Sequence, residues 1–375
     1  MSTSAMPDNL VINNKHKLAG LDHLRALAIT LVFFYHYQLF GHPEWEGRIC
    51  EFGWTGVDLF FVLSGFLIAG QLFATIARRY QISLKQFFIK RFFRIIPAYL
   101  VMVGLYSFAP FLREGEGIAP VWKYLTFTLN YGLDRRYVGT FTHAWSLCVE
   151  EQFYLSLPLI ILLCRYLKVG KKITWLFPLL FIAGFAVREW CWRYQALPNL
   201  KTEGAWTKYI YYPTHNRLDG LLIGVAIAGL FTFWPQIKLR VNNHGNLLLA
   251  TGLVLLAASY FVTLQHSDHK ASVYGYPLVS LAFGFIVAGA VCPSCILYKR
   301  AWWLTSQIAT LSYSIYLVHK MMIHLTQVIG GYLGMDVNGN LMFLLCIISS
   351  ISGALLMRYL VEKPFLKLRD RVLKS

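Results

Sequence analysis

The sequence predicts an all-α, polytopic integral membrane protein of about ten transmembrane helices, with both termini in the cytoplasm. Three observations predict this. Of 375 residues, 57% are hydrophobic and only 14% are charged, whereas soluble proteins carry about 25% charged residues. Ten apolar segments are long enough to cross a hydrocarbon layer of about 30 Å. Lysine and arginine are also distributed unevenly between alternate connecting segments.

The ten apolar segments follow one another along nearly the whole chain. Two of them, 246–264 and 273–292, contain no charged residue, and several others contain ionisable or polar residues within the apolar run. The predicted spans are 20–40, 53–76, 93–112, 144–165, 173–190, 213–233, 246–264, 273–292, 303–329 and 340–360.

The basic residues predict the orientation of these spans. Segments on the side of the two termini hold 21 Lys and Arg residues, those on the other side hold 10, and four lie inside spans. Cytoplasmic loops carry the excess of basic residues, so both termini are expected in the cytoplasm. The same rule explains the net charge of +17. No soluble region of useful size remains for binding nucleic acid.

One membrane domain accounts for almost the whole sequence. Residues 1–17 are a short polar cytoplasmic segment without a signal-peptide pattern, residues 18–361 form the transmembrane domain, and residues 362–375 form a basic cytoplasmic tail. The chain shows no internal repeat. The Cys292–Cys295 pair has no second pair of ligands, so no metal site is predicted.

The first span contains Arg25 and His36, eleven positions apart. Eleven residues are close to three helical turns, so both side chains share one face, roughly 16 Å apart along the axis. Ionisable residues at membrane depth usually serve function. Histidine exchanges protons near neutral pH and arginine matches phosphate geometry. For each residue alone, helix packing or contact with the membrane interface is an equally simple explanation.

Two further arginines open the third span. Arg91 and Arg94 lie one helical turn apart at the predicted cytoplasmic boundary. They suit either simple anchoring on the basic side or a cationic cradle for a phosphate-bearing donor.

Trp145 and Ser146 precede two adjacent carboxylates, Glu150 and Glu151, in an apolar span. On a helix these carboxylates diverge by about 100°, so at most one faces a given site well. Carboxylates at this depth need a partner. Glu150 could orient a histidine, neutralise an arginine, or form a structural bridge between helices.

Weaker signals come from other polar residues in or beside spans. The glycines around Asp58 and Ser64 suit close helix packing, and Arg217 and Asp219 are expected to pair with different helices. Tyr313, Tyr316 and His319 form a stripe that is more typical of packing. His319 and His324 diverge, which argues against a metal pair. The remaining candidate supporting residues are Asp22 and Glu362.

From the residues alone, two functions remain open. One is a membrane transferase that uses a phosphate-bearing donor, with a proton-exchanging histidine at depth. The other is a proton-coupled transporter of glycans or lipids, which often shows repeats with broken helices that are not evident here.

The ordered motifs resemble membrane-bound acyltransferase family 3, the bacterial integral-membrane O-acyltransferases. Each motif is weak by itself, but together they occur in family order across positions 20–365. The matching segments are Gly20-Leu21-Asp22-His23-Leu24-Arg25 with His36, Gly56-Val57-Asp58 to Ser64-Gly65-Phe66, Arg91-Phe92-Phe93-Arg94, Trp145-Ser146-Leu147 to Glu150-Glu151-Gln152-Phe153-Tyr154, Arg217 with Asp219-Gly220, Ser312-Tyr313 to His319, and Glu362-Lys363-Pro364.

The resemblance implies a chemistry and a location. The donor would be acetyl-CoA or another acyl-CoA taken from the cytoplasm, with no bound cofactor, and the protein would lie in the bacterial inner membrane. His36 would act as general base and Glu150 would orient or charge-balance the site. Arg25, Arg91 and Arg94 would hold the CoA phosphates.

The resemblance also implies a hydroxyl acceptor. The expected acceptor is a cell-surface or lipid-linked carbohydrate, such as a polysaccharide or lipopolysaccharide, and a small molecule such as a macrolide is the alternative. Many relatives carry a C-terminal hydrolase-like domain that is not found in this sequence. The chain is therefore expected to be a stand-alone form, which acts directly or with a separate partner protein.

Overall fold

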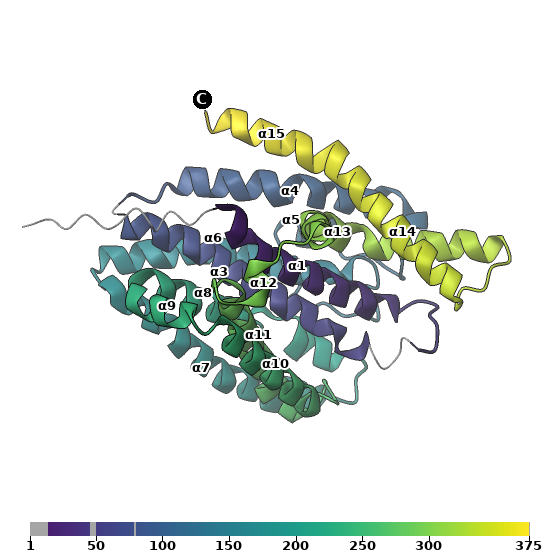
Figure 1. The fold of residues 1–375 in the computed structure, drawn as a ribbon. Helices are drawn as coiled ribbons and strands as arrows, with labels where there is room; N and C mark the ends of the chain where they lie inside the picture. The colour runs from purple at the N-terminus through teal and green to yellow at the C-terminus, as the bar shows by residue number, and fades with distance from the viewer. Residues whose placement is uncertain (1–13, 46–49, 79, 375) are drawn as a thin grey trace, which may run out of the picture.

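The computed structural model describes residues 14–45, 50–78 and 80–374, and within these ranges it contains helices and no strand (Figure 1). This confirms the predicted all-α class. The long helices are α1 (Asn14–Tyr37), α3 (Thr55–Ala77), α4 (Leu84–Phe108), α6 (Trp145–Tyr166), α7 (Ile173–Cys191), α8 (Asp219–Phe233), α10 (Gly245–Val262), α11 (Tyr276–Ala290), α13 (Trp303–Tyr332) and α14 (Asn340–Met357).

Short helices and turns connect the long ones. The short α-helices are α5 (Val121–Leu125), α9 (Pro235–Asn242), α12 (Ile296–Lys299) and α15 (Lys363–Val372). The single turns of 3₁₀- or π-helix are Glu51–Trp54, Pro110–Leu112, Thr142–Ala144, Gly170–Lys172, Trp192–Ala196, Leu197–Asn199, Thr207–Tyr211, Thr214–Asn216, Ala271–Gly275 and Arg358–Glu362.

Each predicted span overlaps one long helix, but not every long helix is apolar enough to cross a membrane. By length and composition, six segments of the described chain qualify, or seven if α8 and α9, bent by 104°, count as one span. Helices α1, α4 and α13 do not qualify, because no stretch of them with the length of a span is both apolar enough and poor enough in charge. The chain is therefore a multi-pass membrane protein, while the count of ten spans and the cytoplasmic termini stay predictions.

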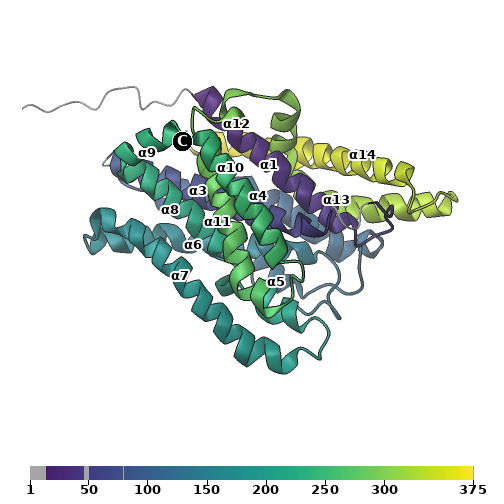
Figure 2. The same cartoon turned by 60° about the horizontal axis from the view of Figure 1, so that its bottom comes forward.

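The centre of the bundle is the contact between α3 and α8. A Cβ atom on Gly65 would lie 2.1 Å from the carbonyl oxygen of Leu221, and one on Gly224 would lie 2.2 Å from that of Val62. Only glycine permits this backbone approach, as in other tightly packed membrane helices. Helix α1 packs against both α3 and α13 and brings the first span to the middle of the molecule (Figures 1 and 2).

Two buried ion pairs fix α8 against its neighbours. Arg217, just before α8, donates to both carboxylate oxygens of Asp58 on α3 at 3.0 Å. Asp219 accepts from Arg188 on α7 at 2.7 Å. The expectation that Arg217 and Asp219 pair with different helices is confirmed.

The bounds predicted for the two terminal segments stay predictions. Most of the predicted N-terminal segment 1–17 lies outside the described residues. The predicted tail 362–375 is largely helical, because α14 runs through Arg358–Glu362 into α15, which lies along α4 (Figure 1). Phe365 on α15 packs against Phe93 on α4, with ring centroids 6.4 Å apart.

Candidate active site

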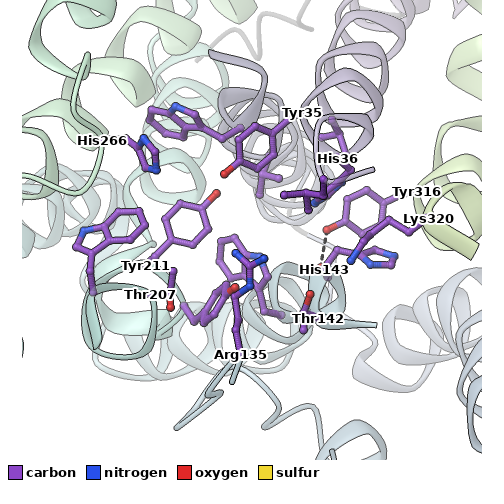
Figure 3. Close-up of a pocket in the computed structure, with 17 residues that line it drawn as sticks. Tyr35, His36, Arg135, Thr142, His143, Thr207, Tyr211, His266, Tyr316 and Lys320 are labelled. Atoms are coloured by element: carbon purple, nitrogen blue, oxygen red, sulfur yellow. Dashed lines mark hydrogen bonds between the residues drawn. The ribbon is translucent and has the colours of Figure 1, made fainter. Parts of the chain in front are cut away.

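Two adjoining cavities lie inside the bundle, and Val57 and Tyr316 line both of them. The first, which we name the histidine cavity, has a volume of about 210 Å³ (Figure 3). The second, the arginine cavity, has a volume of about 160 Å³. The histidine cavity is defined by His36, Arg135, His143, Trp206, Tyr211 and Lys320. The arginine cavity is defined by Arg25, Ser64, Arg91, Arg94, Glu150 and Tyr154.

Three histidines meet at the inner end of the histidine cavity. The ring centroids of His36 and His319 are 4.9 Å apart, and His143 lies 5.6 Å from His36 and 5.1 Å from His319. They come from α1, α13 and the turn before α6. In the described part of the chain, no group of three His, Cys, Asp or Glu residues is arranged to hold a metal ion. His36 and His319 are joined by a hydrogen bond, and His143 contacts both through its ring.

The hydrogen bonds of His319 determine which nitrogen of His36 is free to accept a proton. Nδ1 of His319 lies 3.0 and 2.9 Å from the carbonyl oxygens of Ile315 and Tyr316. Carbonyl oxygens only accept, so this nitrogen carries the hydrogen and Nε2 of the neutral ring carries the lone pair. Nε2 lies 2.8 Å from Nδ1 of His36. His36 therefore donates through Nδ1, which leaves a lone pair on its Nε2.

The arginine cavity gathers the three arginines predicted to hold phosphate. Arg25 comes from α1, and Arg91 and Arg94 come from α4. A neighbouring polar side chain contacts each guanidinium group. Arg25 lies 3.9 Å from Asp22, and Arg91 donates to Gln71 at 3.2 Å. Arg94 lies 3.5 Å from Glu362. The three guanidinium groups thus converge from two helices with their positions fixed.

Glu150 belongs to the arginine cavity rather than to the histidine cluster. Its carboxylate accepts from the hydroxyls of Ser64 at 2.7 Å and Tyr154 at 3.1 Å. It lines the same cavity as the arginines. Of the two roles expected for Glu150, charge balance agrees with this position. Orientation of His36 does not, because His319 makes that contact.

Tyr316 and Ser146 stand between the two cavities. The Tyr316 hydroxyl lies 2.5 Å from Oγ of Ser146 and donates to the backbone carbonyl of His143 at 2.7 Å. Tyr316 lines both cavities, whereas Ser146 lines only the arginine cavity. The side chains of Tyr316 and Ser146 therefore form part of the wall between the histidine cavity and the arginine cavity.

Aromatic side chains form the outer wall of the histidine cavity. The guanidinium of Arg217 lies behind this wall, over the rings of Trp145, Tyr211 and Tyr276 at 5.6, 4.7 and 4.3 Å. These cation–π contacts hold the rings in place. Apart from Tyr316, the Tyr and Trp residues that line the cavity are Tyr35, Trp54, Trp145, Trp206, Tyr211 and Tyr212.

The charged residues lining the histidine cavity are cations. Arg135 lies at its mouth, and Lys320 lies near the histidines with Nζ 3.1 Å from Glu114 (Figure 3). No Asp or Glu is among the described residues that line it. Burial lowers the pKa of His266, which also lines the cavity, so its ring is neutral at pH 7. Because Glu114 pairs with Lys320, the positive charge of the lining comes mainly from Arg135.

The remaining predicted site residues support the cavities from the side. Asp22 accepts from Ser306 at 3.3 Å and lies beside Arg25. Tyr313 lines the arginine cavity and donates to the carbonyl of Ile95 at 2.8 Å. Glu362 accepts from Ser314 and lies 3.3 Å from Arg358 in addition to its contact with Arg94.

Sequence reasoning missed several residues of the histidine cavity. Tyr316 appeared only in a stripe typical of packing, and His143 had no assigned role. His319 was predicted as a supporting residue, but its contact with His36 was not predicted. Arg135 and Lys320 were counted only as basic residues. Two sequence signals pointed to them: His143 lies two positions before Trp145, and Lys320 directly follows His319 in an apolar span.

Comparison with known proteins agrees with the family resemblance seen in the sequence. The family model described as "Acyltransferase domain" matches residues 18–359. O-acetyltransferase OatA from Staphylococcus aureus strain NCTC 8325 is 30% identical over 330 residues, which is 80% of this chain and 50% of the relative. OatA from strain COL matches equally.

The chain spans about half the length of these curated relatives. No solved structure matches it. The family model, however, covers more than nine-tenths of the chain and includes all the residues of both cavities. The chain therefore belongs to the acyltransferase family whose model it matches over residues 18–359.

Proposed function

We propose that this chain is an O-acyltransferase that moves an acetyl or other short acyl group from acyl-CoA to a hydroxyl of a carbohydrate. The observation that carries the proposal is the pair of adjoining cavities with different linings. The arginine cavity suits the phosphates of a CoA donor, and the histidine cavity offers a base beside an aromatic wall. The O-acetyltransferase name of the two curated relatives agrees with this reaction.

The donor binds through charge. Arg25, Arg91 and Arg94 provide planar guanidinium groups that bind phosphate oxygens in pairs. Glu362 pairs with Arg94, and the Glu150 carboxylate, which Ser64 and Tyr154 hold in the cavity lining, offsets part of the positive charge. The acyl thioester then lies toward Tyr316, where the two cavities adjoin.

His36 serves as the general base. The acceptor hydroxyl donates to Nε2 of His36 and gives up its proton as its oxygen attacks the thioester carbonyl carbon. A C–O bond forms, the C–S bond breaks, and the proton passes from His36 to the departing sulfur to give free CoA. His319 accepts from Nδ1 of His36 throughout, so the base stays in the correct tautomer.

The aromatic wall supports a carbohydrate acceptor. Sugar rings present apolar C–H faces between their hydroxyl groups, and rigid indole and phenol rings offer matching flat surfaces with polar edges. Trp206, Tyr211 and Tyr212 supply such rings at the mouth of the histidine cavity. Arg135 adds a cation at the same place, which favours a sugar that carries a carboxylate or phosphate.

The test compares wild type with His36→Ala in a bacterial host that lacks the native protein. Membranes receive acetyl-CoA, release of free CoA is measured, and O-acetyl groups on surface and lipid-linked glycans are quantified by mass spectrometry. His244→Ala removes an exposed histidine outside both cavities and is the matched control.

We expect wild type and His244→Ala to acetylate glycans, and His36→Ala to lose about 10²–10⁴-fold of this rate at equal membrane abundance. Full activity in His36→Ala would remove this histidine from the chemistry. CoA release that requires an added small hydroxyl compound, with unmodified glycans, would replace the carbohydrate by a small-molecule acceptor. Proton-coupled solute movement without CoA release would favour a transporter.

A further inference from the structure

His143 is a buried histidine whose ring nitrogens have no hydrogen-bond partner. Its exposed fraction is 2%, and neither Nδ1 nor Nε2 bonds to a described residue. The backbone carbonyls of Tyr316 and Leu317 lie near the ring, but not in hydrogen-bond geometry. Buried polar side chains in native proteins almost always have a partner, because an unpaired one destabilises the fold. Among the described residues with such unpaired buried atoms, His143 is the one that lines the histidine cavity.

The position of His143 is beside the proposed base. It lines the histidine cavity, where Figure 3 shows it next to Lys320 and Thr142. Its ring lies 5.6 Å from that of His36 and is held edge-on against Phe141 at 5.0 Å. Aromatic packing thus fixes the ring while its polar atoms stay uncommitted.

Two other donors close to the histidines are already engaged. Nζ of Lys320 is 3.1 Å from Glu114. The Tyr316 hydroxyl donates to the carbonyl of His143 at 2.7 Å and contacts Ser146 at 2.5 Å. His36 donates through Nδ1 to His319. A carbonyl oxygen placed near His36 therefore meets two sources of N–H donors: Lys320, whose ammonium keeps N–H groups beyond the one aimed at Glu114, and His143, whose ring has no other partner.

We propose that His143 donates an N–H to the carbonyl oxygen of the acyl thioester and stabilises the negative charge that develops there; the proposal rests on the acyl transfer proposed above. When the acceptor oxygen attacks, the carbonyl π electrons move onto this oxygen, and the hydrogen bond strengthens as the charge grows. A neutral imidazole performs this task without a proton transfer.

The missing hydrogen bonds are part of this argument. Because neither nitrogen of His143 is committed, the tautomer that directs an N–H at the substrate gives up no existing bond. The hydrogen bond from His143 forms only when substrate is bound. It therefore lowers the barrier of the reaction and does not add to the stability of the free protein.

The test uses two variants and one control. His143→Phe keeps the aromatic size and removes the donor, and His143→Gln restores an N–H on a side chain without a titrating group. The control is Ser280→Ala on α11, outside both cavities. It removes a buried hydroxyl that, like the ring of His143, has no hydrogen-bond partner among the described residues. Membrane abundance, thermal unfolding in detergent, and kcat and KM for acetyl-CoA are measured for the full chain.

We expect His143→Phe to unfold at or above the wild-type temperature, because an unpaired polar group is replaced by an apolar one. Its kcat should fall by about 10²–10³-fold with KM for acetyl-CoA nearly unchanged, as for loss of an oxyanion donor. His143→Gln should recover about tenfold of that loss, on the scale of one hydrogen bond. Ser280→Ala should match wild type in both stability and rate.

Two results would overturn the role of His143. One is a kcat of His143→Phe close to wild type, and the other is loss of the folded protein in both variants, which would make His143 a packing residue. In either case an active wild type leaves the proposed acyl transfer standing. If wild type and Ser280→Ala are both folded and release no CoA, the acyl transfer itself fails, and the role of His143 is rejected with it.

Discussion

Nε2 of His319 and Nδ1 of His36 lie 2.8 Å apart, although 283 residues separate them in the sequence. The carbonyl oxygens of Ile315 and Tyr316 fix the tautomer of the first ring, and this ring fixes the tautomer of the second. Two backbone carbonyls of α13 therefore determine which ring nitrogen of His36 accepts a proton.

Replacement of His319 should reduce acyl transfer without removing the base. In His319→Ala, Nδ1 of His36 loses its acceptor and the ring populates both tautomers, so we expect kcat to fall by at least about tenfold, a part of the general-base contribution. His319→Gln should recover part of the rate, since its amide oxygen accepts from Nδ1. CoA release at equal membrane abundance checks both variants. Equal losses in the two variants would indicate a packing role.

The contact between α3 and α8 should be sensitive to a single methyl group. Gly65→Ala places its Cβ within 2.1 Å of the Leu221 carbonyl, so the helices must separate. Gly70→Ala on the same helix meets no atom within 4 Å. Thermal unfolding in detergent should show Gly65→Ala destabilised by about 1–3 kcal/mol. Gly70→Ala should be neutral or stabilised by up to about 1 kcal/mol. Similar behaviour of the two variants would contradict the packing described here.

Breaking the Asp58–Arg217 pair should cost more than removing both charges. Both side chains are almost fully buried, and Arg217 alone would remain an uncompensated charge. We expect Asp58→Asn to lower stability by about 3–5 kcal/mol. Arg217→Met in the Asp58→Asn background should restore part of this loss. A double variant as unstable as the sum of its single variants would show that the pair is not coupled.

Arg135 and Arg136 are neighbours with different surroundings. Arg136 donates to Asp134 at 3.0 and 2.6 Å, and this contact holds the pKa of Asp134 below its usual range, so the pair stays charged at neutral pH. Arg135 lines the histidine cavity instead. With an acidic glycan as acceptor, Arg135→Gln should raise KM by about tenfold, on the scale of one charge-assisted hydrogen bond. Arg136→Gln should leave KM close to wild type. A neutral acceptor that responds equally to Arg135→Gln would rule out charge recognition.

The long helices were predictable from sequence because each carries a continuous apolar run, and this signal is local. The arginine cavity was partly predictable as well, since Arg25 interrupts an apolar span and Arg91 and Arg94 lie one helical turn apart at the start of another. The partner of His36 was not predictable. The stripe of Tyr313, Tyr316 and His319 has the spacing of ordinary packing, and only the tertiary fold brings His319 to α1.

The mouth of the histidine cavity was beyond sequence reasoning for another reason. Arg135, Trp206 and Thr207 lie in irregular segments or in a single π-turn. Such segments carry no periodic pattern, and their path depends on anchors far along the chain. Asn130, for example, donates to Thr214 at 2.8 Å and ties two of these segments together.

The residues in and around the histidine cavity lie on two kinds of structure, packed helices and connecting segments, and this affects how the acceptor range of such a protein can change. His36 and His319 lie on helices locked by backbone contacts and buried charges, whereas Arg135, Trp206 and Tyr212 lie on connecting segments. Loops accept substitutions and insertions that packed helices do not. A new acceptor could therefore be selected by remodelling segments 126–141 and 197–216 while the reacting groups stay in place. Exchange of these two segments between relatives is a direct route to transferases with altered acceptor range.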